Sequence, residues 1–163
     1  MSKPVFTGGC QCGHVTYSST HLPSHFTCCH CLTCRKVSGA PFLTFGEVPV
    51  ESLTFTSGLS SLKKTAYSDF ADRSHCAECG SPISMQYKWE PEVISLAAGT
   101  INEQSVQGNM PKIEQHIFVQ EKAGWYEMPD DGVPKCQTFS SGFQEKFEAW
   151  KKSWRGLGWG ESL

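Results

Sequence analysis

The chain has 163 residues, of which 39% are hydrophobic and 18% are charged, and its formal net charge is −2. This composition predicts one folded domain rather than a disordered chain, and the charge balance gives no basic surface of the kind that nucleic acid requires. The first residues lack the apolar stretch of a signal peptide, and no segment approaches the length of a membrane span. We therefore expect a cytoplasmic protein that binds neither nucleic acid nor membranes.

Most of the chain shows short alternating patterns that are typical of β-strands separated by turns. Strands are predicted at residues 14–19, 42–48, 52–56, 63–67, 83–89, 93–98 and 113–120. A turn is expected at Ser57-Gly58 between the third and fourth of these strands. The predicted fold class is therefore mainly β.

Only the end of the chain has a helical pattern. Ser141 is a suitable N-cap, with Gln144 three residues later as its capping-box partner. Gly156 is the expected stop, before a tail at Gly158-Trp159-Gly160. Four aromatic residues fall on one helix face and are expected to pack against the domain: Phe143, Phe147, Trp150 and Trp154. The predicted organisation is a domain over residues 1–140, followed by a helix and tail over residues 141–163.

The most informative feature is the set of nine cysteines, at positions 10, 12, 28, 29, 31, 34, 76, 79 and 136. In a reducing compartment, so many cysteines favour metal binding over disulfides. Cys76-x-x-Cys79-Gly80 has the spacing of a zinc knuckle, in which one turn presents two sulfurs to the same ion. A closed zinc site takes four ligands, so a second pair of cysteines is required.

Two partitions of the cysteines supply that second pair. If Cys31 and Cys34 join the knuckle, the chain is a zinc-ribbon-like module, and three other cysteines are hard to explain. If Cys10 and Cys12 join it, Cys29 remains with Cys31 and Cys34, and three thiolates leave the fourth position of a zinc ion open, as in catalytic sites. The second partition uses seven of the nine cysteines and is the preferred interpretation.

Six sequence blocks occur in order: Gly8-x-Cys10-x-Cys12-Gly13-x-Val15-x-Tyr17, Cys29-His30-Cys31-x-x-Cys34-Arg35-Lys36 with Ser38-Gly39, Cys76-x-x-Cys79-Gly80-Ser81-Pro82, Ala98-Gly99-Thr100-Ile101, Pro111 followed by His116-Ile117-Phe118, and Trp125. This series resembles the glutathione-dependent formaldehyde-activating (GFA) family, to which centromere-protein-V-type domains also belong. The resemblance covers most of the domain, from about Gly8 to Trp125.

The resemblance implies an Mss4-like fold of short antiparallel strands, with zinc-holding loops and the C-terminal helix, so that residues 1–140 are a GFA-type zinc domain. It implies a carbon–sulfur lyase or synthase that joins or cleaves a thiol such as glutathione and an aldehyde such as formaldehyde through a zinc-bound thiolate. It also implies two zinc ions per chain, a structural one on Cys10, Cys12, Cys76 and Cys79 and a catalytic one on Cys29, Cys31 and Cys34.

Other residues near these blocks have open roles. Glutathione carries two carboxylates, so a basic contact is expected, and the candidates are Arg35, Lys36, Lys63 and Lys64, although each is more often a surface charge. His30 is a candidate acid/base group, an alternative ligand or a hydrogen-bonded structural residue. For His116 we favour a packing role over proton transfer. Cys28 is a spare thiol, a redox partner or a buried core residue, of which the last is favoured. For Cys136 we expect a structural role or a free thiol.

Two other functions stay open at this point. The zinc ions of a non-catalytic binding module would only hold the β-loops in place. A related lyase would act on a different small molecule, because kinship of fold does not fix the substrate.

Overall fold

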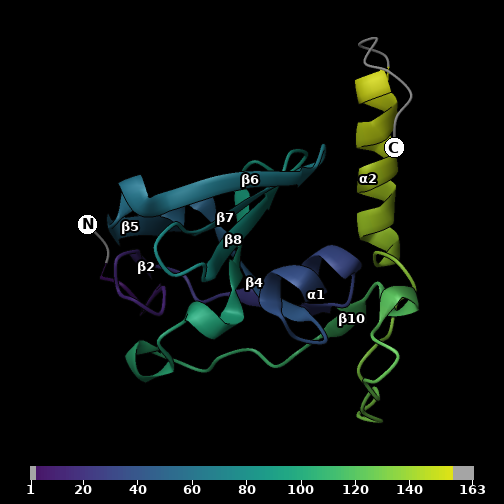
Figure 1. The fold of residues 1–163 in the computed structure, drawn as a ribbon, viewed down its shortest axis with the longest axis horizontal. Coiled ribbons are helices and arrows are strands. Elements are labelled where there is room, and N and C mark those ends of the chain that lie inside the picture. Colours follow the sequence, from purple (N-terminus) through teal and green to yellow (C-terminus); the bar gives the residue numbers. More distant parts are fainter. Residues whose placement is uncertain (1–2, 156–163) are drawn as a thin grey trace.

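The computed structural model describes residues 3–155, and these form a small and a large β-sheet with two α-helices. In Figure 1 the C-terminal helix stands upright at one side of the sheets, and the shorter helix lies in front of the large sheet. Within residues 3–155, no helix combines the length and apolar character that crossing a membrane would need.

The small sheet contains three antiparallel strands in the order β1 (Phe6–Gly9), β2 (Thr16–Ser19) and β5 (Leu53–Ser57). The large sheet has the order β10 (Gln115–Ile117), β3 (Ser24–Cys29), β4 (Leu43–Pro49), β9 (Val93–Ala97), β8 (Pro82–Tyr87), β7 (Ala71–Cys76) and β6 (Leu62–Ser68). Its neighbours are antiparallel except at one edge, where β10 runs parallel to β3. Short 3₁₀ turns occur at Val50–Ser52, Leu59–Ser61, Ala98–Thr100, Glu103–Ser105 and Val119–Glu121.

The mainly β fold class is confirmed, and every predicted strand overlaps an observed one. The parallel pairing of β10 with β3 is a difference from the expected all-antiparallel arrangement. Three strands, β1, β3 and β7, and the helix α1 (Leu32–Ser38) were not predicted. Each of the three missed strands ends in glycines or in a cysteine block that the sequence pattern assigns to metal-binding loops.

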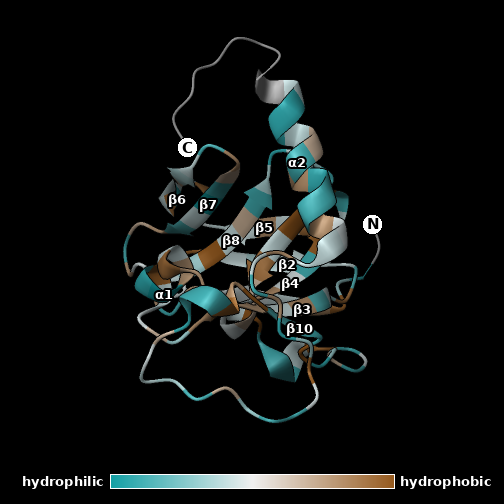
Figure 2. Ribbon diagram, turned by 90° about the vertical axis from the view of Figure 1, so that its right-hand side faces the viewer, coloured by the Kyte–Doolittle hydropathy of each residue, from teal (hydrophilic) through white to brown (hydrophobic). Residues whose placement is uncertain are grey.

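The predicted C-terminal helix is present as α2 (Ser141–Arg155). Figure 2 shows hydrophilic and more hydrophobic stretches in alternation along α2. The rings of Phe143 and Phe147 each lie 5.5 Å from the ring of Trp89, which follows β8. The aromatic stripe therefore packs against the large sheet. The Gln144 side chain donates a hydrogen bond to Glu148 instead of completing a capping box. The Trp154 side chain lies outside the described part of the structure, as do residues 156–163 with the predicted stop and tail.

Two hydrophobic clusters form the interior, and each contains cysteines. The first cluster, around Tyr17, Ile83 and Leu96, includes Cys10 and Cys76. The second cluster lies beneath α2 and is built around Phe45, Met85 and Phe139, and it includes Cys29 and Cys34. Because buried apolar surroundings restrict the rotation of these cysteine side chains, the fold fixes the directions of their sulfurs.

Candidate metal centres

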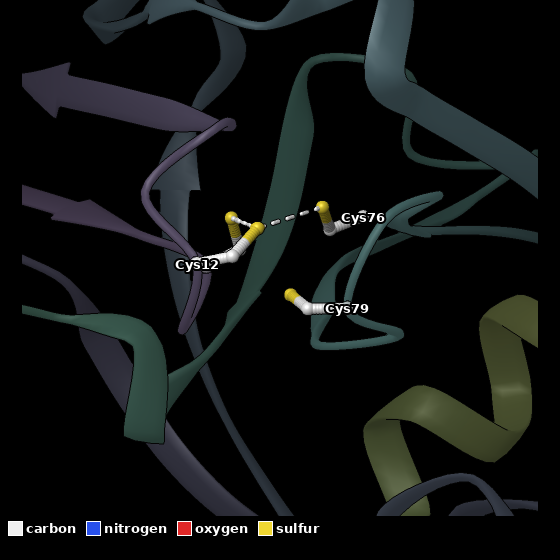
Figure 3. Close-up of side chains that lie close together, drawn as sticks. Cys12, Cys76 and Cys79 are labelled. Atoms are coloured by element: carbon white, nitrogen blue, oxygen red, sulfur yellow. Dashed lines mark hydrogen bonds between the residues drawn. The ribbon is translucent and has the colours of Figure 1, made fainter.

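A four-cysteine cluster joins the two sheets. Cys10 and Cys12 follow β1 of the small sheet, whereas Cys76 ends β7 of the large sheet and Cys79 follows it. Their Sγ atoms all lie within 4.8 Å of one another, and Figure 3 shows the labelled side chains of Cys12, Cys76 and Cys79 converging on one point. The sulfurs of two distant sequence motifs therefore share one small volume.

Two glycine turns bring these sulfurs together. Gly13 has a φ of 77° and its N–H donates to the Cys10 carbonyl at 3.1 Å. Gly80 has a φ of 75° and its N–H donates to the Cys76 carbonyl at 2.9 Å. This left-handed conformation is unfavourable for residues with a Cβ atom, so both turns require glycine at these positions.

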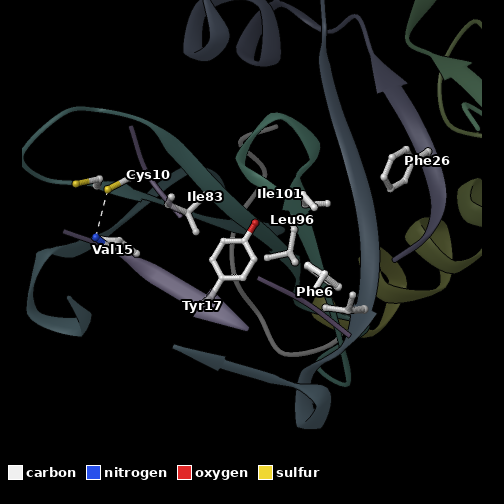
Figure 4. Close-up of a cluster of buried hydrophobic side chains, with 10 residues drawn as sticks. Phe6, Cys10, Val15, Tyr17, Phe26, Ile83, Leu96 and Ile101 are labelled. Atoms are coloured by element: carbon white, nitrogen blue, oxygen red, sulfur yellow. Dashed lines mark hydrogen bonds between the residues drawn. The ribbon is translucent and has the colours of Figure 1, made fainter. Parts of the chain in front are cut away.

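The spacing of the sulfurs fits a tetrahedral zinc ion. With Zn–S bonds of about 2.3 Å, the sulfurs of a tetrahedral site lie about 3.8 Å apart. The Cys10–Cys12 and Cys12–Cys76 sulfur separations are 3.5 and 3.8 Å. The Cys10 sulfur also accepts the Val15 N–H at 3.2 Å beside the first hydrophobic cluster (Figure 4). A bond with the Ser81 hydroxyl lowers the pKa of the Cys79 thiol to about 5.

A three-cysteine cluster lies within a single short segment. Cys29 is the last residue of β3, Cys31 is the N-cap of α1, and Cys34 lies in the first turn of that helix. The Cys34 N–H donates to the Cys31 sulfur at 3.4 Å, and the three Sγ atoms lie within 4.8 Å of one another. Cys29 and Cys34 are buried and Cys31 is half-buried. The end of a strand and the start of a helix thus point three sulfurs at one position.

The proximity of these three sulfurs makes their protonation states interdependent. Hydrogen bonds with Cys31 and Cys34 hold the pKa of the Cys29 thiol far above its usual range. Hydrogen bonds from Cys29 and Cys34 lower the pKa of the Cys31 thiol to about 2. One thiolate is therefore stabilised by two protonated neighbours. A thiophilic cation would take the place of those protons, so this donor set also fits zinc.

Arg73 supplies positive charge beside the three-cysteine cluster. It comes from the unpredicted strand β7, and its Nη2 donates to the Cys34 sulfur at 3.4 Å. Its guanidinium carbon lies 5.7 Å from the centre of the Phe45 ring. Burial lowers the pKa of Arg73, but the neighbouring Cys34, Cys31 and Tyr87 together raise it by more, so the side chain keeps its charge. Sequence reasoning missed this residue because it lies 39 positions from Cys34.

His30 points away from the sulfurs, toward His116. The side chain of His30 is fully buried, and its Nε2 lies 2.9 Å from Nδ1 of His116 on β10. Its ring packs 5.1 Å from Phe42 and 5.8 Å from Tyr126. Burial and the neighbouring His116 lower the pKa of His30 to about 4. These contacts support the structural alternative for His30 and the packing role expected for His116.

The remaining candidates occupy different surroundings. Cys28 is buried, with its sulfur 3.3 Å from the Thr44 hydroxyl, and Cys136 packs half-buried against the second hydrophobic cluster. Arg35 donates to the Glu121 carbonyl at 2.6 Å. Lys36 and the two lysines of β6, Lys63 and Lys64, are exposed. The basic residues that the sequence suggested as glutathione contacts are therefore bonded to the chain itself or lie at the surface.

The chain belongs to the family described as glutathione-dependent formaldehyde-activating enzyme, whose pattern matches residues 5–121. This confirms the resemblance seen in the sequence blocks. A curated relative, an "uncharacterized lyase" of Schizosaccharomyces pombe, is 30% identical over 84 residues, which are 52% of this chain and 59% of the relative. The chain therefore spans about three-fifths of the length of that relative.

A solved structure shares the fold. The crystal structure of a Rhodobacter sphaeroides protein, a Northeast Structural Genomics target, has a TM-score of 0.52 and 20% sequence identity. The similarity covers 64% of this chain and 97% of that protein. The shared part accounts for most of that protein.

Proposed function

We propose that the chain is a zinc-dependent carbon–sulfur lyase or synthase, which joins or cleaves a thiol and an aldehyde at the three-cysteine cluster. The observation that carries this proposal is the presence of two sulfur clusters of different size, one of four and one of three. Four sulfurs satisfy a zinc ion, whereas three leave one position for an exogenous ligand. The family description and the lyase name of the relative agree with this assignment.

In this proposal Cys29, Cys31 and Cys34 are metal ligands and not nucleophiles. Zinc held by three thiolates would offer its fourth position to a substrate thiol and lower the pKa of that thiol. The four-cysteine cluster would hold the second zinc and serve only the fold. Arg73 would offset part of the negative charge that collects when an additional thiolate approaches the three sulfurs.

The reaction is an addition and its reverse. The substrate sulfur forms a bond to the carbonyl carbon, the carbonyl π electrons move to oxygen, and the proton released by the thiol ends on that oxygen. In the reverse direction the carbon–sulfur bond breaks and the carbonyl re-forms. Glutathione and formaldehyde, which the family description names, are the first pair to test, under the reducing conditions of a cytoplasmic location.

Metal analysis combined with exchange kinetics tests the proposal. The zinc-loaded protein should contain two zinc ions per chain and accelerate the exchange of ¹³C-formaldehyde with a thiol adduct, measured by NMR with glutathione and, separately, with an uncharged thiol. Cys31→Ser should lose one zinc and the acceleration, whereas the control Cys136→Ser, outside both sulfur clusters, should keep both. A Cys31→Ser protein that retains two zinc ions and full exchange rates would remove the proposal.

A further inference from the structure

Two pockets share a wall that includes Cys29. The larger has a cavity volume of about 260 Å³ and reaches Cys31 and Thr33 at the start of α1. The smaller has a cavity volume of about 50 Å³ and extends toward Phe143 of α2. A cavity of about 150 Å³ can hold a benzene ring, so the larger pocket has room for one aromatic ring. Cys29, Arg73, Tyr87 and Phe139 line both pockets, so a molecule bound to the three-cysteine cluster would contact this wall.

Aromatic side chains dominate the larger pocket. It is lined by Tyr67, Phe70, Tyr87, Phe118 and Phe139. Phe118 and Phe139 meet edge to face with their ring centres 4.8 Å apart, and Phe70 and Tyr87 stack with centres 6.4 Å apart. These contacts fix the rings in place, so the pocket presents preformed apolar surface to the substrate.

The charges at these pockets do not suit a dicarboxylate. Glu121 lines the larger pocket and Glu47 the smaller, and among the described residues Arg73 is the one Lys or Arg that lines either. Arg73 is already engaged with the Cys34 sulfur. His25, which also lines the smaller pocket, has its Nδ1 3.2 Å from the Glu114 carboxylate. A glutathione molecule here would place two carboxylates near two glutamates and several thiolates.

The structure assigns the site, which rests on the function proposed above, to an uncharged thiol that carries an aromatic ring or a similar apolar group. The sulfur of that thiol occupies the open position beside Cys29 and Cys31. Its ring lies against Phe70, Phe118 and Phe139 in the larger pocket. Burial of the ring provides affinity, and Glu121 disfavours an anionic competitor.

Thiol binding can be measured without turnover in a cobalt-substituted protein. A thiolate that binds Co(II) at the three-cysteine cluster changes the absorption spectrum of the ion. The four-cysteine cluster has no open position and should not respond. Four probe thiols separate ring from charge: benzyl mercaptan, its para-carboxylate, β-mercaptoethanol and glutathione. We expect benzyl mercaptan to bind at least about tenfold more tightly than each of the others. Glutathione binding as tightly as benzyl mercaptan would overturn this assignment and leave the proposed function standing.

Variants locate the preference in the larger pocket. Tyr67→Ser removes a ring from the pocket lining that is 53% exposed, so the fold should be unaffected. This variant should bind benzyl mercaptan about threefold more weakly and β-mercaptoethanol with unchanged affinity. Glu121→Gln keeps an acceptor for the Leu32 N–H and should improve glutathione binding by about fivefold. Val50→Ser, an exposed control on the turn after β4, should change neither.

Two further results would overturn the inference. Tyr67→Ser and Glu121→Gln proteins with unchanged affinities for all four thiols would overturn the assignment of the larger pocket. A cobalt protein whose spectrum responds to none of the thiols would overturn the proposed function as well as this inference.

Discussion

The two sulfur clusters use the same ligand chemistry but connect different parts of the molecule. Cys12 and Cys76 are 64 positions apart and tie the small sheet to the large one. Cys29, Cys31 and Cys34 belong to one strand–helix junction and tie nothing distant together. A metal in the four-cysteine cluster closes a long loop of the chain, whereas a metal in the three-cysteine cluster only orders a short segment.

Their surroundings differ in the same sense. The four-cysteine cluster is built from two glycine turns, and its sulfurs contact one another and groups of the same loops, namely the Val15 N–H, the His14 ring and the Ser81 hydroxyl. The three-cysteine cluster has Arg73 beside it, and Cys29 lines two pockets. The comparison indicates that the four-cysteine cluster serves stability and the three-cysteine cluster serves chemistry. The following substitutions test that division.

The largest expected effect is the loss of folding in Cys76→Ser. Cys76 is fully buried in the first hydrophobic cluster. Zinc binding at closed cysteine sites contributes about 10–16 kcal/mol to folding, which is comparable with the total stability of a domain. We therefore expect no cooperative urea transition, followed by circular dichroism. Cys136→Ser is the matched control, and a Cys76→Ser protein with the wild-type midpoint would contradict the structural role.

Removing the charge of Arg73 should affect metal binding at the three-cysteine cluster alone. Arg73→Met keeps most of the side-chain volume but leaves the Cys34 sulfur without its cationic partner. We expect the more weakly held zinc to lose about 10–100-fold in affinity, as for other supporting residues of metal sites, in a competition assay with a chromophoric chelator. Arg73→Lys should be intermediate. Lys63→Met, an exposed control on the neighbouring strand β6, should have wild-type affinity.

The buried histidine pair predicts a smaller, pH-dependent effect. Burial lowers the pKa of His116 in the folded chain, so the unfolded chain takes up a proton first. This stability is present above the ordinary histidine pKa of about 6.5 and is lost as the pH falls below it, by up to about 1.4 kcal/mol at one unit below.

His116→Asn should reduce this loss, because an asparagine side chain can replace Nδ1 as the partner of His30. The measurement is urea unfolding at pH 7.5 and at pH 5.5 with saturating zinc. His21→Gln, at an exposed position, is the control and should retain the wild-type difference. Equal pH dependence in the wild type and His116→Asn would show that His116 does not contribute to the loss of stability.

Local patterns in the sequence were sufficient to predict the strands whose polar and apolar residues alternate. They were also sufficient to predict α2, whose aromatic residues repeat at helical spacing. They also divide seven cysteines into the two groups that the structure brings together, because ligand chemistry imposes short fixed spacings within each motif. That these groups bind zinc stays a prediction.

Contacts between distant segments were not predictable in the same way. Strand β7 has a largely polar sequence and is ordered by its neighbours β6 and β8. The Arg73–Cys34 contact and the His30–His116 pair join residues 39 and 86 positions apart. A single sequence gives no information on such pairs. The short helix α1 was missed for a different reason, since its seven residues show no helical periodicity and its N-cap is a cysteine.

That cysteine cap permits a final, smaller test of the division between the clusters. Cys31 is both a candidate ligand and the residue whose side chain accepts the Cys34 N–H. Serine caps a helix well whereas alanine does not, and the difference is about 1 kcal/mol. Cys31→Ser and Cys31→Ala should therefore lose the same zinc ion, but Cys31→Ser should be more stable by about this amount in urea. Equal stabilities would mean that the Cys31 sulfur acts only toward the metal and that α1 does not depend on its cap.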